Sequence, residues 1–331
     1  MKNYFILFPF VKIINGVARN ILYDSQRQNI KFISGVEVEI LHNLAKHDID
    51  TVALRYSKKT LNDLINNYVE TGFAIVTSGI NSRKMLKLSE LYDSPNLIEN
   101  AIIIIHENTN SSIYSEAINQ LSELNCRVIS IRMYSENASL LHLERCISKI
   151  IESHILHCEL LLPIDSQSRV YSLICDNNHY HVDFSIFYFG CKKSDYIPGP
   201  PNQYFIKGKL TKNDCGVFHP SLLNLDYSHF CLSKSFNSCL FKKVVIDEDG
   251  NIKNCPLFTQ SHGKIFEDSL ADIITLQKFQ DWWHIKKDDI SVCCGCEFRY
   301  FCHDCRAVTV EDGFFEKPLN CSYNPKTTKW K

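Results

Sequence analysis

Nine of the fifteen cysteines lie between residues 231 and 321, and their spacing could bind metal. The densest block reads CCGCEFRYFCHDC and contains two Cys-x2-Cys pairs, Cys293 with Cys296 and Cys302 with Cys305. Two thiolates separated by two residues on a tight turn can ligate one centre, and two such pairs supply the four ligands of a closed site. The block therefore predicts a thiolate-bound metal or iron–sulfur centre.

Two alternatives to an iron–sulfur centre remain open for these cysteines. A zinc site with four cysteine ligands uses similar spacings. Buried free thiols that pack as small apolar side chains are the second alternative. Disulfides are not expected, because the opening MKNYFILFPFVKI lacks the small-residue cleavage site of a secretory signal, which predicts a cytoplasmic protein with reduced thiols.

A second block, CLSKSFNSCLFKKVVIDEDGNIKNCP, precedes the dense one, and Cys321 follows both. The whole arrangement resembles the SPASM domain, the C-terminal part of many radical-SAM peptide-modifying enzymes, which binds two auxiliary 4Fe–4S clusters. One departure is that the last spacing in the dense block is two residues, where the family usually has three.

The resemblance implies two sets of cofactor ligands that interleave along the chain. One cluster would be held by Cys231, Cys239, Cys255 and Cys305. The other would be held by Cys293, Cys296, Cys302 and Cys321. Cys294 is left over beside Cys293, and either of these two neighbours could be the ligand.

The residues between the cysteines predict the elements that position them. Phe241 to Ile246 reads as a strand, Asp249-Gly250 as a hairpin turn, and Asn251 to Cys255 as the returning strand. This hairpin would bring Cys239 and Cys255 to the same end. Apolar residues at roughly helical spacing predict a packing helix over 265–285.

The first 80 residues predict strands at Tyr4–Ile14, Val17–Tyr23 and Asn29–Ile33, then two helices and a strand at Phe73–Val76. Ser34 would cap the first helix through a capping box and Thr60 the second. This order resembles the winged-helix, PqqD-like module that captures leader peptides. The resemblance implies docking along the edge at 29–33, with three apolar residues near the groove: Leu61, Leu64 and Ile65. The alternative is that these three belong to the core.

Strand and helix signals alternate through residues 84–215, which predicts a parallel sheet with helices outside. Predicted strands include 101–106, 126–132, 157–163, 170–175 and 181–189. Before a SPASM-like region this segment resembles a reduced radical-SAM partial barrel. The family's Cys-x3-Cys-x2-Cys is missing, since residues 1–125 hold no cysteine and the six cysteines at 126–215 lie at least twelve residues apart. No S-adenosylmethionine site of that type is expected.

The charge balance argues against a strongly electrostatic partner. The 331 residues carry a formal net charge of −1, and residues 1–85 carry a surplus of only four basic residues. Neither value indicates binding to nucleic acid or to a charged membrane surface. The apolar runs are also too short to span a bilayer.

Taken together, the chain resembles the SPASM-domain peptide maturases of the grasp-with-spasm type. The expected fold class is α/β, with a winged-helix-like module at 1–80, a radical-SAM-like body at 84–215 and an iron–sulfur SPASM domain at 216–331. The implied function is maturation of a ribosomally made peptide, with a precursor peptide and an ATP-grasp ligase as partners. The sequence leaves open whether the protein is itself an enzyme or an accessory. The alternative function is a zinc-binding winged-helix regulator or scaffold.

Overall fold

The computed structural model of the protein describes residues 2–79, 86–135, 140–175, 181–192, 202–216, 218–309, 313 and 315–330. The chain divides into two compact units. The first contains residues 1–92, 218–238 and 286–331, and the second contains 93–217 and 239–285. Residues 239–285 thus fold with the α/β segment, whereas the three functional segments expected from the sequence remain a prediction.

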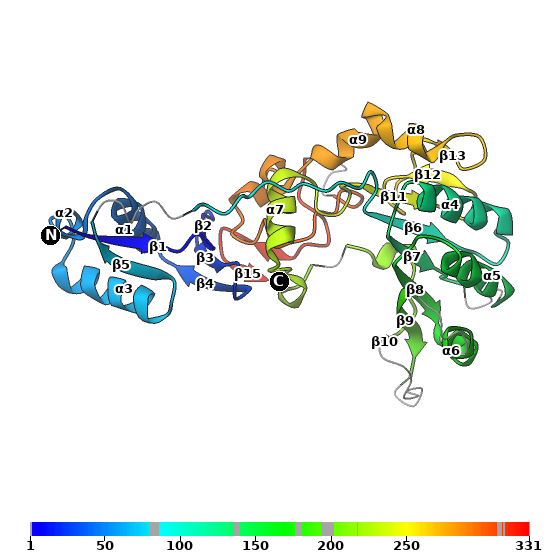
Figure 1. The fold of residues 1–331 in the computed structure, drawn as a ribbon, viewed down its shortest axis with the longest axis horizontal. Helices are drawn as coiled ribbons and strands as arrows, with labels where there is room; N and C mark the ends of the chain where they lie inside the picture. The colour runs from blue at the N-terminus through cyan, green and yellow to red at the C-terminus, as the bar shows by residue number, and fades with distance from the viewer. Residues whose placement is uncertain are drawn as a thin grey trace. The chain divides into compact units, whose positions relative to one another are not determined.

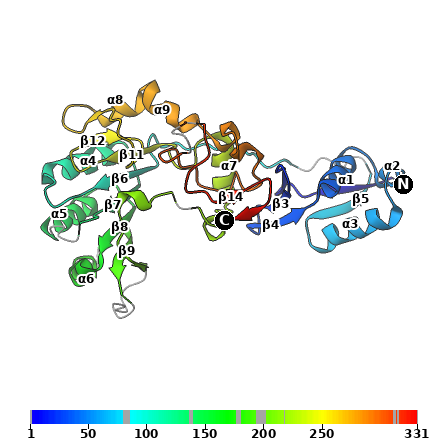
Figure 2. The same cartoon turned by 180° about the vertical axis from the view of Figure 1, so that it is seen from behind.

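An eight-stranded sheet organises the second unit (Figures 1 and 2). Its order is β10-β9-β8-β7-β6-β11-β12-β13, parallel from β10 to β11 and antiparallel from β11 to β13. The parallel strands are β6 (Asn100–Ile104), β7 (Val128–Arg132), β8 (His157–Pro163), β9 (Asp183–Cys191), β10 (Gln203–Lys207) and β11 (Lys243–Ile246). The predicted α/β class is confirmed in this coarse form, a mixed and mostly parallel sheet.

Three helices connect these parallel strands: α4 (Ser111–Glu123), α5 (Leu140–Ile151) and α6 (Gln167–Cys175). The strand predicted at residues 170–175 is wrong, because this run belongs to α6. A single 3-10 turn, η2 (Ile164–Ser166), leads from β8 directly into that helix. The periodicity of a short apolar run fits a strand and a helix equally well. Residues 170–175 lie in the connection between two parallel strands, β8 and β9, and such a connection is usually helical.

The predicted hairpin in the cysteine-rich segment is confirmed as β11 and β12 (Asn251–Lys253), with Ile246 opposite Ile252. Gly250 has φ +80°, a conformation that favours glycine. The Asp247 carboxylate accepts hydrogen bonds from the backbone N–H groups of Asp249 and Asn251, at 3.1 and 2.9 Å. The sequence did not indicate that β11 also pairs in parallel with β6.

The single helix predicted over 265–285 is wrong in extent. The chain forms a short strand, β13 (Gly263–Lys264), and then two helices, α8 (Leu270–Thr275) and α9 (Gln277–His284). Leu276 separates the helices with an extended backbone, φ −64° and ψ 131°. Both helices bury apolar residues, Ile273 and Ile274 on α8 and Phe279 and Trp283 on α9, which accounts for the helical spacing of the run.

Two small sheets build the N-terminal part of the first unit. β1 (Asn3–Leu7) pairs with β5 (Ala74–Ser78), and β2 (Val11–Ile14), β3 (Asn20–Asp24) and β4 (Asn29–Ile33) form an antiparallel meander. The strand predicted over residues 4–14 is therefore two strands, which a turn at Pro9 separates. Proline cannot donate to a strand ladder, which favours this break.

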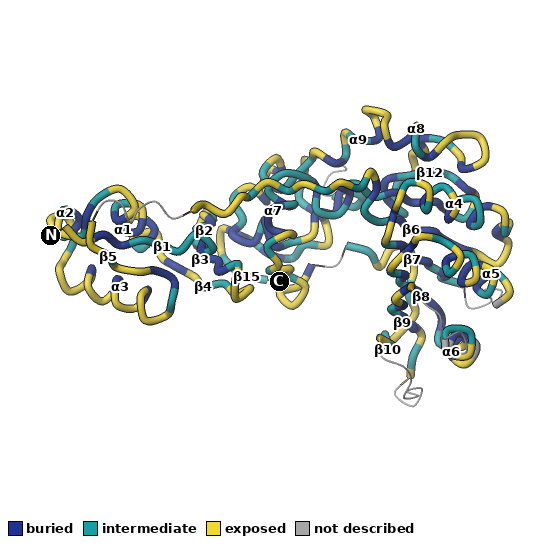
Figure 3. Tube along the Cα trace, in the orientation of Figure 1, coloured by how far each residue is buried: buried dark blue, intermediate teal, exposed yellow. Residues whose placement is uncertain are grey.

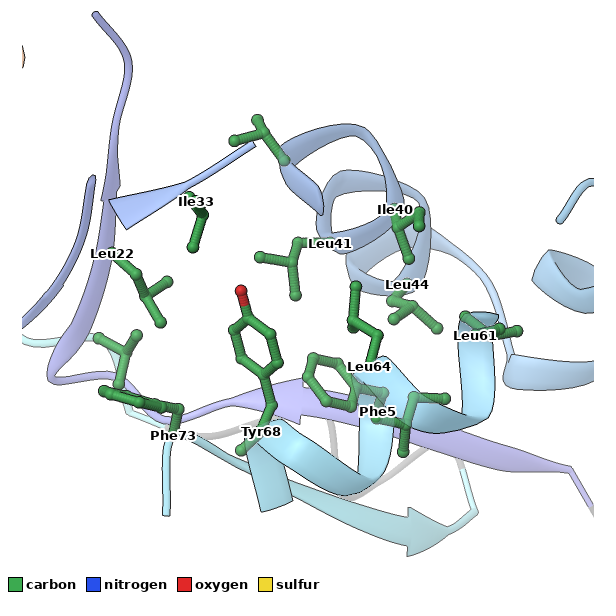
Figure 4. Packing of buried hydrophobic residues seen from close by; sticks show 14 of the residues in the cluster. Phe5, Leu22, Ile33, Ile40, Leu41, Leu44, Leu61, Leu64, Tyr68 and Phe73 are labelled. Atoms are coloured by element: carbon green, nitrogen blue, oxygen red, sulfur yellow. The ribbon is translucent and has the colours of Figure 1, made fainter. Parts of the chain in front are cut away.

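The helices of this module are α1 (Gly35–Lys46), α2 (Ile49–Ala53) and α3 (Lys58–Glu70). The capping box at Ser34 is confirmed, with Glu37 Oε2 accepting from the Ser34 N–H at 2.8 Å. The cap predicted at Thr60 is wrong, because α3 begins one turn earlier and Ser57 caps it. The core between helices and strands includes Leu41, Leu64 and Tyr68 (Figure 4).

A second core in the first unit joins the meander to later parts of the chain. These are α7 (Tyr227–Ser235) and the segment that ends in β14 (Tyr323–Asn324) and β15 (Lys329–Trp330). Its buried members include Ile21, Tyr23, Phe230 and Phe301. Four consecutive residues of β3 are buried, whereas β4 has two exposed residues, Asn29 and Phe32 (Figure 3). Among the described residues, no helix is long and apolar enough to cross a membrane.

Candidate metal centre

Four cysteines predicted to share one cluster all lie in the first unit: Cys293, Cys296, Cys302 and Cys321. The 3-10 turn η6 (Cys293–Gly295) places the first two on one tight turn, where the Cys296 N–H donates to the Cys293 carbonyl at 2.9 Å. Cys293 is buried and the other three are half-buried. Cys296 and Cys321 both pack against the same apolar core.

The pKa values of these thiols depend on burial and on the charges around them. Burial raises the pKa of Cys302 to about 12; Lys287 opposes this, whereas Cys321 and Cys293 add to it. Burial likewise raises the pKa of Cys293 and Cys296, and each is raised further by another cysteine of the four. Burial therefore favours the protonated forms of Cys293, Cys296 and Cys302. A bound cation would favour their thiolates.

The β2–β3 turn holds the loop that carries the first two thiols. The Val17 N–H donates to the Gly295 carbonyl at 2.8 Å, and Arg299 Nη1 donates to the carbonyls of Asn15 and Cys296 at 2.7 and 2.9 Å. A Cβ at position 16 would lie 2.3 Å from the Arg19 carbonyl oxygen. Gly16 is therefore required for this close approach.

Glu297 links the loop to the last cysteine of the set. Its side chain is fully buried, and Oε1 accepts hydrogen bonds from Arg19 Nε at 2.9 Å and from the Tyr323 hydroxyl at 2.5 Å. Glu297 directly follows Cys296, and Tyr323 lies two residues after Cys321. This carboxylate therefore holds the two ligand-bearing segments together.

Two cations and a carboxylate are buried beside the cysteines. Lys287, Asp304 and Arg306 have exposed fractions of 3%, 1% and 4%. Asp304 Oδ1 lies 2.8 Å from Arg306 Nε and 3.5 Å from Lys287 Nζ. Arg299, in the same cysteine block, instead pairs with Asp288 at 2.9 Å. Lys287 and Glu297 were missed, although both stand close in sequence to predicted ligands.

The structure distinguishes Cys293 from its neighbour. Cys293 is 8% exposed, whereas Cys294 is exposed and its Sγ donates to the Ser291 carbonyl at 3.3 Å. A buried ligand is easier to shield from solvent and oxygen than an exposed one. This geometry favours Cys293 as the ligand.

The other predicted ligand set has members in both units. Cys231 on α7 and Cys305 belong to the first unit, and both are buried. Cys239 and Cys255 belong to the second unit, at the end of the hairpin where β11 begins and β12 ends. The Lys243 ammonium lies 3.6 Å from Cys239 Sγ. Assembly of these four into one site remains a prediction.

Within the described ranges, no three histidine, cysteine or acidic side chains are arranged around a single metal ion. The predicted clusters therefore rest on the cysteine spacing and on the presence of Cys293, Cys296, Cys302 and Cys321 in one unit. Of the remaining cysteines, Cys126, Cys146 and Cys158 are completely buried, as expected for core residues.

The structure bears both on the predicted peptide-docking edge and on the three apolar residues expected beside it. In the described part of the chain β4 pairs only with β3, so one of its edges lacks a strand partner. Leu61, Leu64 and Ile65, expected near a groove, are at most 9% exposed and belong to the core. Their spacing reflects the packing of α3 against the core. The sequence had left this core role open as the alternative.

The similarity of this chain to solved structures is distant. No protein-family model matches the chain, and no curated protein matches it. Solved structures of SuiB from Streptococcus suis are similar at 13% identity. The one bound to S-adenosylmethionine has a TM-score of 0.39, covering 92% of this chain and 96% of that chain. The one bound to the precursor peptide SuiA has a TM-score of 0.36, covering 92% and 94%. A likeness of this size does not establish a shared fold.

Proposed function

We propose that the protein is a maturation protein for a ribosomally made peptide, which binds a precursor peptide and two 4Fe–4S clusters. One observation supports the proposal: four cysteines with SPASM-like spacing belong to one unit, the first two on a single tight turn. Cys293, Cys296, Cys302 and Cys321 would hold one cluster. Cys231, Cys239, Cys255 and Cys305 would hold the other. A bound cluster supplies an electron store or a rigid anchor for the surrounding loops.

The proposal does not include cleavage of S-adenosylmethionine, since the sequence lacks the three closely spaced cysteines for it. A binding and presenting role is therefore the simplest version, with an ATP-grasp ligase of the same system as the second partner. The protein's own residues position the ligands: Glu297 fixes the Cys296 loop, and the β2–β3 turn supports it from the N-terminal meander.

Metal analysis of protein purified without oxygen tests the clusters. We expect a brown protein that holds about eight iron and about eight sulfide per chain after reconstitution. Element analysis and the visible absorbance of the iron–sulfur chromophore measure this directly. A colourless protein with stoichiometric zinc would instead support the regulator or scaffold, because four thiolates also form a closed zinc site.

Peptide binding is expected along β4. An added strand would hydrogen-bond to its open edge, and Phe32, 46% exposed there, would contact the peptide side chains. Replacing Phe32 by glutamate should weaken binding of a labelled precursor leader peptide at least tenfold, as measured by fluorescence anisotropy. Val69→Glu on α3, 38% exposed in the wild type, is the matched control. Equal affinity of both variants and wild type would rule out this edge.

A further inference from the structure

Among the residues that the structure describes, Lys31 on β4 is the one cation of the β2–β4 meander without a carboxylate partner. The other three each form an ion pair at 2.6 to 3.0 Å: Lys12, Arg19 and Arg27. Lys31 is half-buried. Taking a charge partly out of water is unfavourable unless other groups stabilise it. The surroundings of Lys31 therefore indicate what the edge of β4 can bind.

The contacts of the Lys31 ammonium are a neutral amide and two aromatic rings. Nζ donates to Asn67 Oδ1 on α3 at 2.7 Å, and it lies 4.9 Å from the centre of the Tyr68 ring and 6.0 Å from that of Phe73. A hydrogen bond from an ammonium to a carboxylate is stronger than one to an amide. Asn67 is exposed, so a ligand can reach this position. A carboxylate that arrived here would thus be favoured over the amide.

Lys31 and its neighbour Phe32 present different chemistry on the two faces of β4. Lys31 stands opposite Leu22 of β3, whose side chain points into the core that the helices cover (Figure 4). Phe32 lies on the other face, where the Arg19 guanidinium is 3.7 Å from the centre of its ring. Successive side chains of a strand point to opposite faces. A strand added to the open edge of β4 would therefore place one side chain beside Lys31 and the next beside Phe32.

We propose that Lys31 is the specificity-determining residue of the β4 edge, and that it selects a precursor peptide with an acidic side chain directly beside an apolar one. The proposal deepens the proposed function and rests on it, because it requires a peptide strand on β4. When the peptide binds, the Lys31 ammonium exchanges the Asn67 amide for the peptide carboxylate. The adjoining apolar side chain of the peptide contacts Phe32.

The helix beside this edge limits how much negative charge the peptide can carry. Asp63 and Glu70 lie four residues before and three residues after Asn67 on α3, and both are exposed. Residues three and four apart are neighbours on the surface of a helix, so the two carboxylates lie on the same side of α3 as Asn67. They repel an acidic run. The favoured peptide therefore has a single carboxylate at this point, with neutral residues around it.

The test uses peptides selected from a displayed random library on the full chain, purified without oxygen. Only peptides that Phe32→Glu fails to retain are kept, because these depend on the β4 edge. They should share one aspartate or glutamate beside an apolar residue. Changing that acidic residue to its amide should weaken binding of the labelled peptide to wild type about tenfold, as measured by fluorescence anisotropy.

Reversing the charge of Lys31 gives an independent measurement. Lys31→Glu should bind the acidic peptide about tenfold more weakly than wild type, and it should prefer the same peptide with lysine at the acidic position. Lys59→Glu is the matched control, since Lys59 is an exposed lysine in the first turn of α3. This control should bind both peptides as wild type does.

Equal binding of the acidic and amide peptides to wild type would overturn the selection by Lys31, while leaving the peptide site of the proposed function in place. This comparison needs no substitution at Lys31, so it decides the matter even where Lys31→Glu does not fold. A library that yields no peptide dependent on Phe32 would overturn the peptide site and the selection together.

Discussion

Replacing Cys302 by alanine is expected to lower the iron content of the reconstituted chain from about eight to about four atoms. Cys302 is one of the four cysteines of one predicted ligand set, all of which lie in the first unit. A 4Fe–4S cluster that lacks one of its cysteine ligands loses iron more readily. Iron and sulfide analysis after gel filtration measures the effect, and electron paramagnetic resonance shows which signal disappears.

Cys294 provides the matched control for this change. It lies in the same block, but it is exposed and its thiol donates to the Ser291 carbonyl. Cys294→Ala should keep the full complement of iron. Loss of iron from the Cys294 variant together with retention in Cys293→Ala would reverse the assignment of the ligand. Equal iron in Cys302→Ala and wild type would remove Cys302 from the site.

Glu297→Ala is expected to destabilise the first unit by about 3 kcal/mol, the usual cost of breaking a buried charge pair. The substitution leaves Arg19, whose side chain is 28% exposed, and the Tyr323 hydroxyl without their shared acceptor. It also frees the loop that carries Cys296 from the segment that carries Cys321. Urea unfolding of the metal-free chain, followed by tryptophan fluorescence, measures the change.

Glu70→Ala removes a carboxylate from the exposed end of α3 and is the control for loss of one negative charge. Its effect should stay within about 0.5 kcal/mol, as for most surface substitutions. If the two variants unfold at the same urea concentration, Glu297 does not hold the ligand-bearing segments together. Reduced iron uptake by Glu297→Ala alone would connect this carboxylate to the cluster as well.

Local sequence signals predicted much of the fold. The Asp249-Gly250 turn, the Ser34 capping box and β4 at 29–33 depend on neighbouring residues, so they could be read directly. Residues 170–175 and 265–285 were misassigned because a short apolar run shows burial without showing which element is buried. The pairing of β11 with β6 joins segments that lie far apart in the sequence, which no local pattern reveals.

The sequence predicted the thiols of the candidate site but not the other side chains around them. Cysteine spacing indicated the ligands, since two residues between thiolates is a geometric requirement of the turn. Glu297 was missed because its partners, Arg19 and Tyr323, come from distant parts of the chain. Lys287 was missed because burial of a lysine can be seen only after folding. The contact of Arg299 with the Asn15 carbonyl was missed because these two residues lie far apart in the sequence.

The order of synthesis bears on the core that unites β3 with Phe230, Phe301 and Tyr323. A ribosome makes the meander first, yet its apolar face on this side stays in contact with water until the last of these partners has been translated. During that interval Ile21 and Tyr23 are a surface on which chaperones could act and from which aggregation could begin. Proteins cut short before residue 321 should therefore be poorly recovered from cells, even when the α/β unit in them is intact.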